Sequence, residues 1–199
     1  MKFSKQTWIA LAFIIVIAAL RLTLNLTGEY HDLSNFSGIG AMAIFGGAYF
    51  KNQGKAFAFP VLALLITDLI LAQTIYKPYS NGFLYGGWYW VYGSFILMVV
   101  VGRFLKNRIT LVNIVVSVIV VTMIHWLVTN FGVWIGGGTD VVTGQKFTRD
   151  IAGFWRCLYL AIPFERNFIA GTMAYSAIMF GGMELVKSKA AAKAVPSSE

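Results

Sequence analysis

The apolar residues of this chain stand in long blocks that few charges interrupt, and this pattern limits the fold more than any other feature. A helix needs about 20 mostly apolar residues to cross the hydrocarbon core of a membrane. Only 12% of the residues are charged, about half the fraction usual in soluble domains. The sequence therefore predicts an all-α integral membrane protein, with strong spans at residues 7–26, 56–73, 86–102, 109–135 and 168–187.

A sixth segment, residues 37–50, is short and rich in glycine. As a helix it rises only about 21 Å, so it crosses a membrane only where other helices shelter it or the bilayer is thin. We count it as a span because of the charges around it. With the N-terminus in the cytoplasm, ten of the sixteen Lys and Arg residues then fall inside and five outside, as the positive-inside rule requires.

The predicted fold is thus a six-transmembrane-helix bundle in the bacterial inner membrane, with both ends in the cytoplasm. The net charge of +8 belongs to its inner loops, so we expect no nucleic-acid partner beside the lipid bilayer. Residues 1–187 form a single transmembrane domain, followed by a disordered cytoplasmic tail at 188–199. The first span is read as an uncleaved helix, because no small-residue cleavage site follows it.

Residues 151–162 have helical spacing but are too short to cross the membrane. We expect a short interfacial or re-entrant helix that Pro163 ends. Two spans also carry small residues at spacings that permit close helix packing, inside the bundle or against a partner. They are Gly40, Ala43 and Gly47 in the second span and Ala170, Ala174, Ala177 and Gly181 in the last.

Asp68 is the most costly residue of the chain, since it stands inside an apolar span. Insertion of an Asp at mid-helix costs roughly 2.5–3.5 kcal/mol, so it should face the bundle interior or water. His125 lies at a similar predicted height, and the two can share one outward-facing chamber. They either line a ligand site or relay protons, or else serve as polar pins between helices.

Aromatic residues crowd the predicted outer end of the bundle between Tyr76 and Tyr92. An interfacial belt explains many of them, but rings beside flexible glycines also suit stacking on a planar ligand. The fifth span ends in a similar way, with Trp126, Asn130 and Trp134 four residues apart on one face. An amide beside flat rings can orient a small polar-aromatic solute, and we expect Asn130 and Trp134 to contact it.

Sequence signatures of nucleotide binding, metalloproteases, metal clusters and serine hydrolases are all missing. No second acid or nucleophile pairs clearly with Asp68 or His125. We therefore expect no enzyme, no cofactor and no metal site.

Several stretches carry a resemblance to a known family over residues 10–185, namely "SGIGAMAIFGGAYF", "PVLALLITDLIL", "TNFGVW", "GFWRCLYLAIPFERN" and "YSAIMFGG". They resemble an uncharacterised bacterial family assigned to transport. That family is similar to the S components, the substrate-binding membrane subunits of energy-coupling factor vitamin transporters.

The resemblance implies a six-helix protein that binds a small vitamin-like solute from outside and passes it inward with an ATPase-driven module. It places the substrate-binding contacts at Asp68, Tyr85, Trp88, Tyr89, Asn130, Trp134, Arg156 and Asn167. The first span lacks the Ala-x-x-x-Ala face with which many S components dock that module. A proton-coupled secondary transporter and a structural or assembly factor of the membrane stay open as alternatives.

Overall fold

The computed structural model of the chain describes residues 4–27, 35–80 and 82–192. These residues form six α-helices, one short 3-10 helix and no strand. The helices lie close to the predicted spans. They are α1 (Lys5–Thr27), α2 (Ile39–Tyr49), α3 (Gln53–Gln73), α4 (Trp88–Phe104), α5 (Leu111–Ile135) and α6 (Ile151–Ala192), with the 3-10 helix η2 at Lys77–Tyr79.

Four helices, α1, α3, α5 and α6, are long and apolar enough to cross a membrane, while α2 and α4 are shorter apolar helices. Large apolar side chains on the outside of the bundle point away from the core, for example Ile66 on α3 and Val116 on α5. A soluble protein rarely exposes so continuous an apolar surface. The fold is that of a helical membrane protein.

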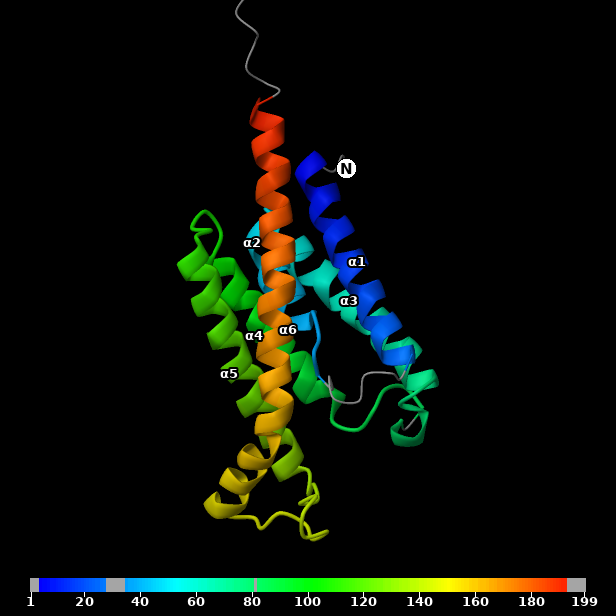
Figure 1. The fold of residues 1–199 in the computed structure, drawn as a ribbon. Helices are drawn as coiled ribbons and strands as arrows, with labels where there is room; N and C mark the ends of the chain where they lie inside the picture. The colour runs from blue at the N-terminus through cyan, green and yellow to red at the C-terminus, as the bar shows by residue number, and fades with distance from the viewer. Residues whose placement is uncertain (1–3, 28–34, 81, 193–199) are drawn as a thin grey trace, which may run out of the picture.

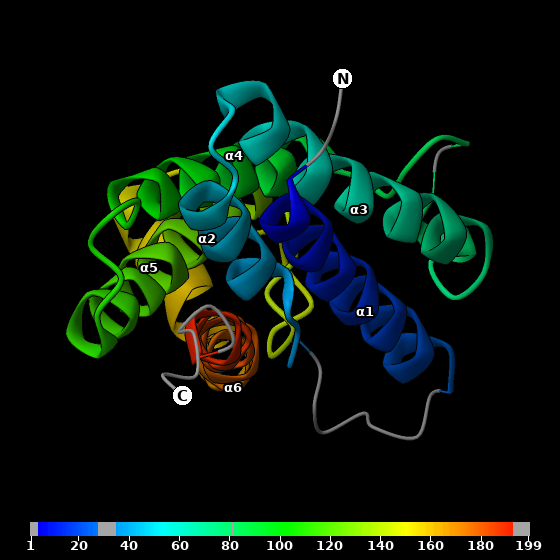
Figure 2. The ribbon, with the colours of Figure 1, turned by 90° about the horizontal axis from the view of Figure 1, so that it is seen from above.

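Helix α2 is the centre of the bundle. It contacts all five other α-helices, and the view along the bundle in Figure 2 shows it surrounded by them. Each of its eleven residues is buried. A helix of that length rises only about 16 Å, but its burial means that it does not depend on lipid contact along its length.

Glycine makes the close contacts of α2 possible. A Cβ added at Gly47 would lie 2.4 Å from the carbonyl oxygen of Val99, and one at Gly102 would lie 2.4 Å from that of Ile44. Helices α2 and α4 therefore touch backbone to backbone at this crossing. Gly40 packs closely against the side chain of Thr172 on α6, so the predicted packing of this stripe inside the bundle is confirmed.

The small-residue stripe of α6 does not pack inside the bundle, and that part of the prediction is wrong. Ala170, Ala174 and Ala177 are exposed, and a Cβ at Gly181 would meet no atom within 4 Å. The buried face of α6 is instead the neighbouring one, with Phe168, Thr172, Ser176 and Met179.

Residues 151–162 are helical as predicted, but Pro163 does not end that helix. Helix α6 continues through Pro163 to Ala192 without interruption, and Figure 1 shows its first part bent relative to the rest. A proline removes one backbone hydrogen bond and crowds the preceding turn, which bends a helix more readily than it stops one. Residues 188–192 of the predicted disordered tail are helical too, and 193–199 lie outside the described residues.

The N-terminal end of α1 and the C-terminal end of α6 lie at the same end of the bundle (Figure 1). The opposite end carries residues 136–150, which fold into a compact loop between α5 and α6. The two ends of the bundle thus differ, with the chain termini at one and this large connection at the other.

Candidate functional site

Asp68 lies on α3 with no solvent exposure, and its partner is Arg21 of α1. The Nη2 of Arg21 donates to Oδ1 of Asp68 at 2.6 Å, and its Nη1 donates to the hydroxyl of Thr67. The side chain of Arg21 is itself only 10% exposed. The two charges therefore form an ion pair inside the bundle, between two helices that are both long enough to cross a membrane.

Two tyrosines from the segment after α3 form hydrogen bonds near this ion pair. The hydroxyl of Tyr85 donates to Oδ2 of Asp68 at 3.1 Å. That of Tyr76 donates to Oδ1 of Asn25 at 3.2 Å, and the amide of Asn25 donates in turn to the backbone oxygen of Arg21. Side-chain hydrogen bonds thus tie the connection between α3 and α4 to the end of α1.

Both tyrosines stay protonated near neutral pH. Burial raises the pKa of the Tyr85 hydroxyl, and the negative charge of Asp68 raises it further. Burial likewise raises the pKa of the Tyr76 hydroxyl. A phenol in this state donates a hydrogen bond to a carboxylate and does not compete with it as an anion.

Tyr92 of α4 adds a buried hydroxyl near the same carboxylate. This hydroxyl lies within reach of the Asp68 carboxylate, but it forms no hydrogen bond of good geometry with any described residue. Buried polar groups are normally satisfied. The hydroxyl of Tyr92 can therefore donate either to Asp68 after a small movement or to a ligand atom or water molecule beside the ion pair. We call Arg21, Thr67, Asp68, Tyr85 and Tyr92 the charged cluster.

His125 does not join Asp68. Its Nδ1 lies 3.0 Å from Oε1 of Glu165 on α6, and its ring stacks on Phe168 with 4.0 Å between ring centres. Asp68 and His125, which were predicted to be able to share one chamber, thus have different partners: Arg21 and Tyr85 for Asp68, and Glu165 and Phe168 for His125. The contacts of His125 fit the alternative in which it pins two helices together.

The polar side chains of Trp126, Asn130 and Trp134 on one face of α5 all donate to backbone oxygens, of the α5–α6 connection, of α6 or of α5 itself. The indole of Trp134 donates to the backbone oxygen of Thr148 at 2.8 Å, and that of Trp126 donates to the backbone oxygen of Leu158. The amide of Asn130 donates to the backbone oxygen of Trp126, one turn earlier. This face of α5 was predicted to bind a ligand, and its polar groups instead bind backbone.

Arg156 binds an acid of the same connection. Its Nε donates to Oδ2 of Asp140 at 2.8 Å, while Oδ1 of Asp140 accepts from the backbone of Val142 and Thr143. Arg156, followed by these backbone bonds, lowers the pKa of Asp140. A ligand anion at Arg156 would have to displace this carboxylate. Asn167 lies half-buried on α6.

Trp88 and Tyr89 lie at the start of α4. The ring of Trp88 meets that of Tyr92 edge to face, with centres 5.4 Å apart, so Trp88 is a neighbour of the charged cluster. Tyr89 is 58% exposed, as expected of a residue in an interfacial belt.

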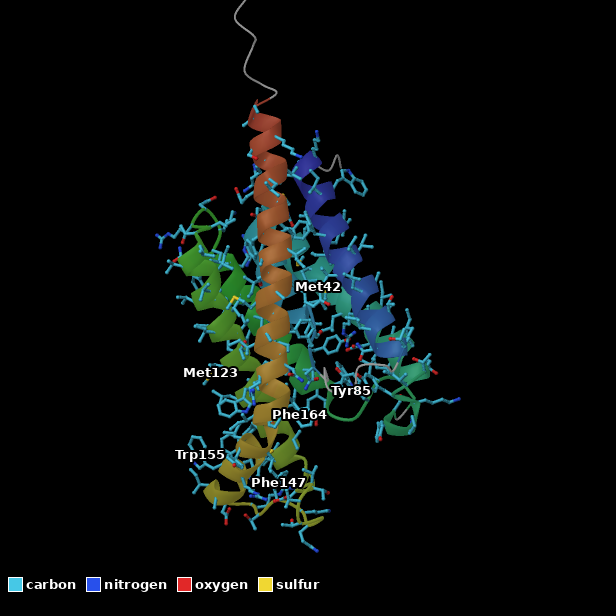
Figure 3. All side chains as sticks on the ribbon, in the orientation of Figure 1. Met42, Tyr85, Met123, Phe147, Trp155 and Phe164 are labelled. Atoms are coloured by element: carbon cyan, nitrogen blue, oxygen red, sulfur yellow. The ribbon has the colours of Figure 1, made fainter. Side chains whose placement is uncertain are left out.

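The structure thus brings together part of the predicted site and separates the rest. Asp68 and Tyr85 meet directly, with Trp88 beside them through Tyr92. Asn130, Trp134 and Arg156 have their contacts on the α5–α6 side. Figure 3 shows this separation, with Tyr85 on the side of α1 and α3 and Trp155 on the side of α5.

Sequence reasoning missed Arg21 as the partner of Asp68. The signal was present, because Arg21 and Asp68 are opposite charges inside two different predicted spans. Each charge alone is costly in a membrane, and pairing with the other lowers that cost, so the two residues could have been expected to pair. No group of three or more potential metal-ligating side chains occurs in the described ranges.

Comparison with known proteins places the chain in a family but does not name its activity. No curated protein matches the chain. No solved structure matches it either. Residues 1–195 match the model of a family described as a family of unknown function, DUF6580. Because that match covers nearly the whole chain, the protein belongs to the DUF6580 family.

Proposed function

We propose that this protein is a multi-pass transport protein that binds a small polar solute at the charged cluster. The observation that carries the proposal is the buried ion pair of Arg21 and Asp68, with the hydroxyl of Tyr92 within reach of it. Ionisable residues inside membrane helices are costly, and those that face a bundle interior mark substrate or ion pathways by default.

The chemistry of the cluster suits a solute with both donor and acceptor groups. The guanidinium of Arg21 binds carboxylate or phosphate oxygens, and the carboxylate of Asp68 accepts from amines or hydroxyls. Tyr85 and Tyr92 add two hydroxyls, while the ring of Trp88 gives a flat apolar surface. A vitamin-like or amino-acid-like molecule has this mixture of groups.

The proposed topology has six crossings with both ends in the cytoplasm of a bacterial inner membrane. The termini lie at one end of the bundle, as an even number of crossings requires. The positively charged turns, with Lys51 and Lys55 after α2 and Arg103 and Lys106 after α4, favour the cytoplasm. The charged cluster then lies toward the outer ends of α1 and α3, under the segment that carries Tyr85.

In this proposal the protein acts as S components do, taking a solute from outside and relying on an ATPase-driven module for release. Support comes from the helix count, from the position of the termini and from the connection over the cluster. The hydrogen bonds of Tyr76 and Tyr85 hold that connection against α1 and α3.

A solute screen by thermal unfolding tests the proposal. The purified protein is heated with vitamins, amino acids and nucleosides, and a ligand at about 100 times its Kd stabilises by about 2.7 kcal/mol. The same screen uses a double variant, Arg21→Met with Asp68→Leu. Replacing both charges of a buried pair by apolar residues is often neutral or stabilising, so this variant keeps the fold and loses the site.

The control is a second ion pair, Arg156→Met with Asp140→Asn, in the α5–α6 connection. A solute that stabilises the wild type and the control but not the Arg21–Asp68 variant supports the proposal. A solute that stabilises all three proteins equally contradicts it, as does a screen in which no solute stabilises the wild type. That last result favours a structural or assembly factor.

A proton-coupled secondary transporter is a second candidate, which the contact between His125 and Glu165 favours. A histidine and a carboxylate within one bundle can pass a proton between them. Uptake into vesicles would then need a proton gradient and no ATP, and Glu165→Gln would abolish that dependence. Uptake that needs ATP and ignores the gradient contradicts this candidate.

A further inference from the structure

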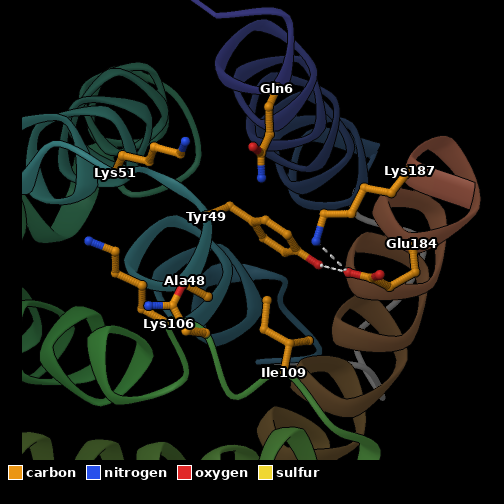
Figure 4. A pocket seen from close by; sticks show the side chains of 9 residues that line it. Gln6, Ala48, Tyr49, Lys51, Lys106, Ile109, Glu184 and Lys187 are labelled. Atoms are coloured by element: carbon orange, nitrogen blue, oxygen red, sulfur yellow. Dashed lines mark hydrogen bonds and ion pairs between the residues drawn. The ribbon is translucent and has the colours of Figure 1, made fainter. Parts of the chain in front are cut away.

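The end of the bundle that carries the termini holds a cavity of about 370 Å³, separate from the charged cluster. Its walls come from the start of α1, the end of α2, the turn between α4 and α5, and α6. Figure 4 shows the side chains around it. The polar ones include Lys51, Lys106, Glu184 and Lys187, and the apolar ones include Tyr49 and Ile109.

The cavity has an excess of positive charge. Glu184 is its single carboxylate, and it accepts from Lys187 at 2.8 Å and from the hydroxyl of Tyr49 at 2.7 Å. Lys51 and Lys106 form no ion pair with any residue that the structure describes. Two ammonium groups are therefore left to bind an anion.

The C-terminal end of α2, which lines the cavity, does not repel an anion bound in it. The C-terminus of a helix carries partial negative charge on its last carbonyl groups, and here Arg103 binds two of them. Its Nη1 donates to the oxygens of Gly47 at 3.0 Å and Phe50 at 2.7 Å. Arg103 thus neutralises the helix end, while the two lysines keep their charge for a ligand.

An apolar surface lies next to the positively charged cavity. Ile109 lines the cavity, and the turn that carries it is flanked by Phe104 and Leu111, both 77% exposed. In a membrane protein these residues face lipid chains. A ligand with an anionic head and an apolar tail would therefore find partners for both of its parts.

We propose that this cavity binds a phosphate group, and that the phosphate is carried by the headgroup of an anionic lipid. Lysine binds phosphate as a compact point charge, and basic pockets between membrane helices at the cytoplasmic side bind anionic headgroups. In the proposed topology, on which this site rests, the lipid binds at the cytoplasmic end of the bundle. Its binding does not require a solute at the charged cluster.

Titration of the full-length protein in nonionic detergent micelles tests this site, with phosphatidylglycerol, phosphatidylcholine or inorganic phosphate as the probe. We expect phosphatidylglycerol to bind in preference to the other two. The variant Lys51→Gln with Lys106→Gln should weaken binding roughly thirtyfold, since each lysine near a membrane surface contributes a factor of about five to six. The matched control, Lys77→Gln with Lys146→Gln, removes the same charge from exposed positions elsewhere and should change nothing.

A third variant gives a result in the opposite direction. Glu184→Gln keeps an acceptor for Tyr49 but releases Lys187, so phosphatidylglycerol should bind severalfold more tightly. Equal weakening by both lysine pairs, or no preference for the anionic lipid, would overturn the site. Inorganic phosphate that competes at the same concentration through the same two lysines would assign the cavity to a soluble phosphate and overturn the lipid as its source. Thermal unfolding of each variant separates loss of binding from loss of fold.

Discussion

At the scale of single residues, Arg21 and Asp68 depend on each other. Asp68→Asn leaves the guanidinium of Arg21 largely buried without its anion, and breaking a buried pair in this way costs about 3–5 kcal/mol. The double variant Arg21→Met with Asp68→Leu leaves no buried charge unpaired and removes only the acceptor of the Tyr85 hydroxyl, so it should recover most of that lost stability. Unfolding in mixed detergent micelles measures the free energy of unfolding of the single variant and of the double variant. A double variant as unstable as Asp68→Asn would mean that the pair stabilises the bundle in its own right.

We expect the stability of the loop at residues 136–150 to depend on pH through Asp140. Its pKa in the folded protein lies below the ordinary value of 3.8, so its ionised form stabilises the loop. That contribution is present above the unfolded pKa and is lost as the pH falls below 3.8 through the folded pKa.

Hydrogen exchange of residues 140–148, corrected for the intrinsic effect of pH, checks this. Protection should fall in that acidic range in the wild type. In Asp140→Asn, protection should be low and nearly independent of pH. Protection that persists unchanged well below the ordinary pKa would contradict the role given to Asp140.

Individual residues also show where sequence reasoning succeeds. Asp68 could be singled out because an acid in an apolar span has few places to go. The roles of Asn130 and Trp134 could not be foreseen, because helical spacing places side chains on one face but does not say what covers it. Here the face is covered by residues 148 and 158, which come from the connection and from α6.

At the scale of elements, the crossing of α2 and α4 has no room for a side chain at Gly102. Gly102→Ala would place its Cβ 2.4 Å from the carbonyl oxygen of Ile44, and overpacking of this kind costs typically 1–3 kcal/mol. The matched control is Gly181→Ala, whose Cβ would meet nothing within 4 Å. Thermal unfolding should separate the two variants clearly. Equal stability of the two would contradict the backbone contact between α2 and α4.

The positions of the helices were predictable and their ends were less so. Apolar blocks flanked by Lys, Asn or Gly place all six helices, and α3 and α5 begin at the capping side chains of Asn52 and Thr110. Pro163 shows the limit. A proline marks either a bend or an end, and the choice depends on whether tertiary packing holds the two halves together.

For the whole molecule, the proposed order of inside and outside loops rests on the positions of the positive charges and can be tested by labelling. In a background of Cys157→Ser, Gln53→Cys and Gln145→Cys are offered a membrane-impermeant reagent in sealed cells. We expect label at position 145 only, since position 53 follows the short positively charged turn after α2. Label at position 53 and none at 145 would invert the proposed topology.

Binding of a polar solute at the charged cluster can be tested by identifying the small molecules that the protein retains through purification. The wild type and the Arg21→Met, Asp68→Leu double variant are purified side by side, denatured, and their released small molecules compared by mass spectrometry. We expect about one equivalent of a solute in the wild type and none in the variant, while thermal unfolding shows that both empty proteins are folded. The same solute in equal amounts from both proteins would contradict it.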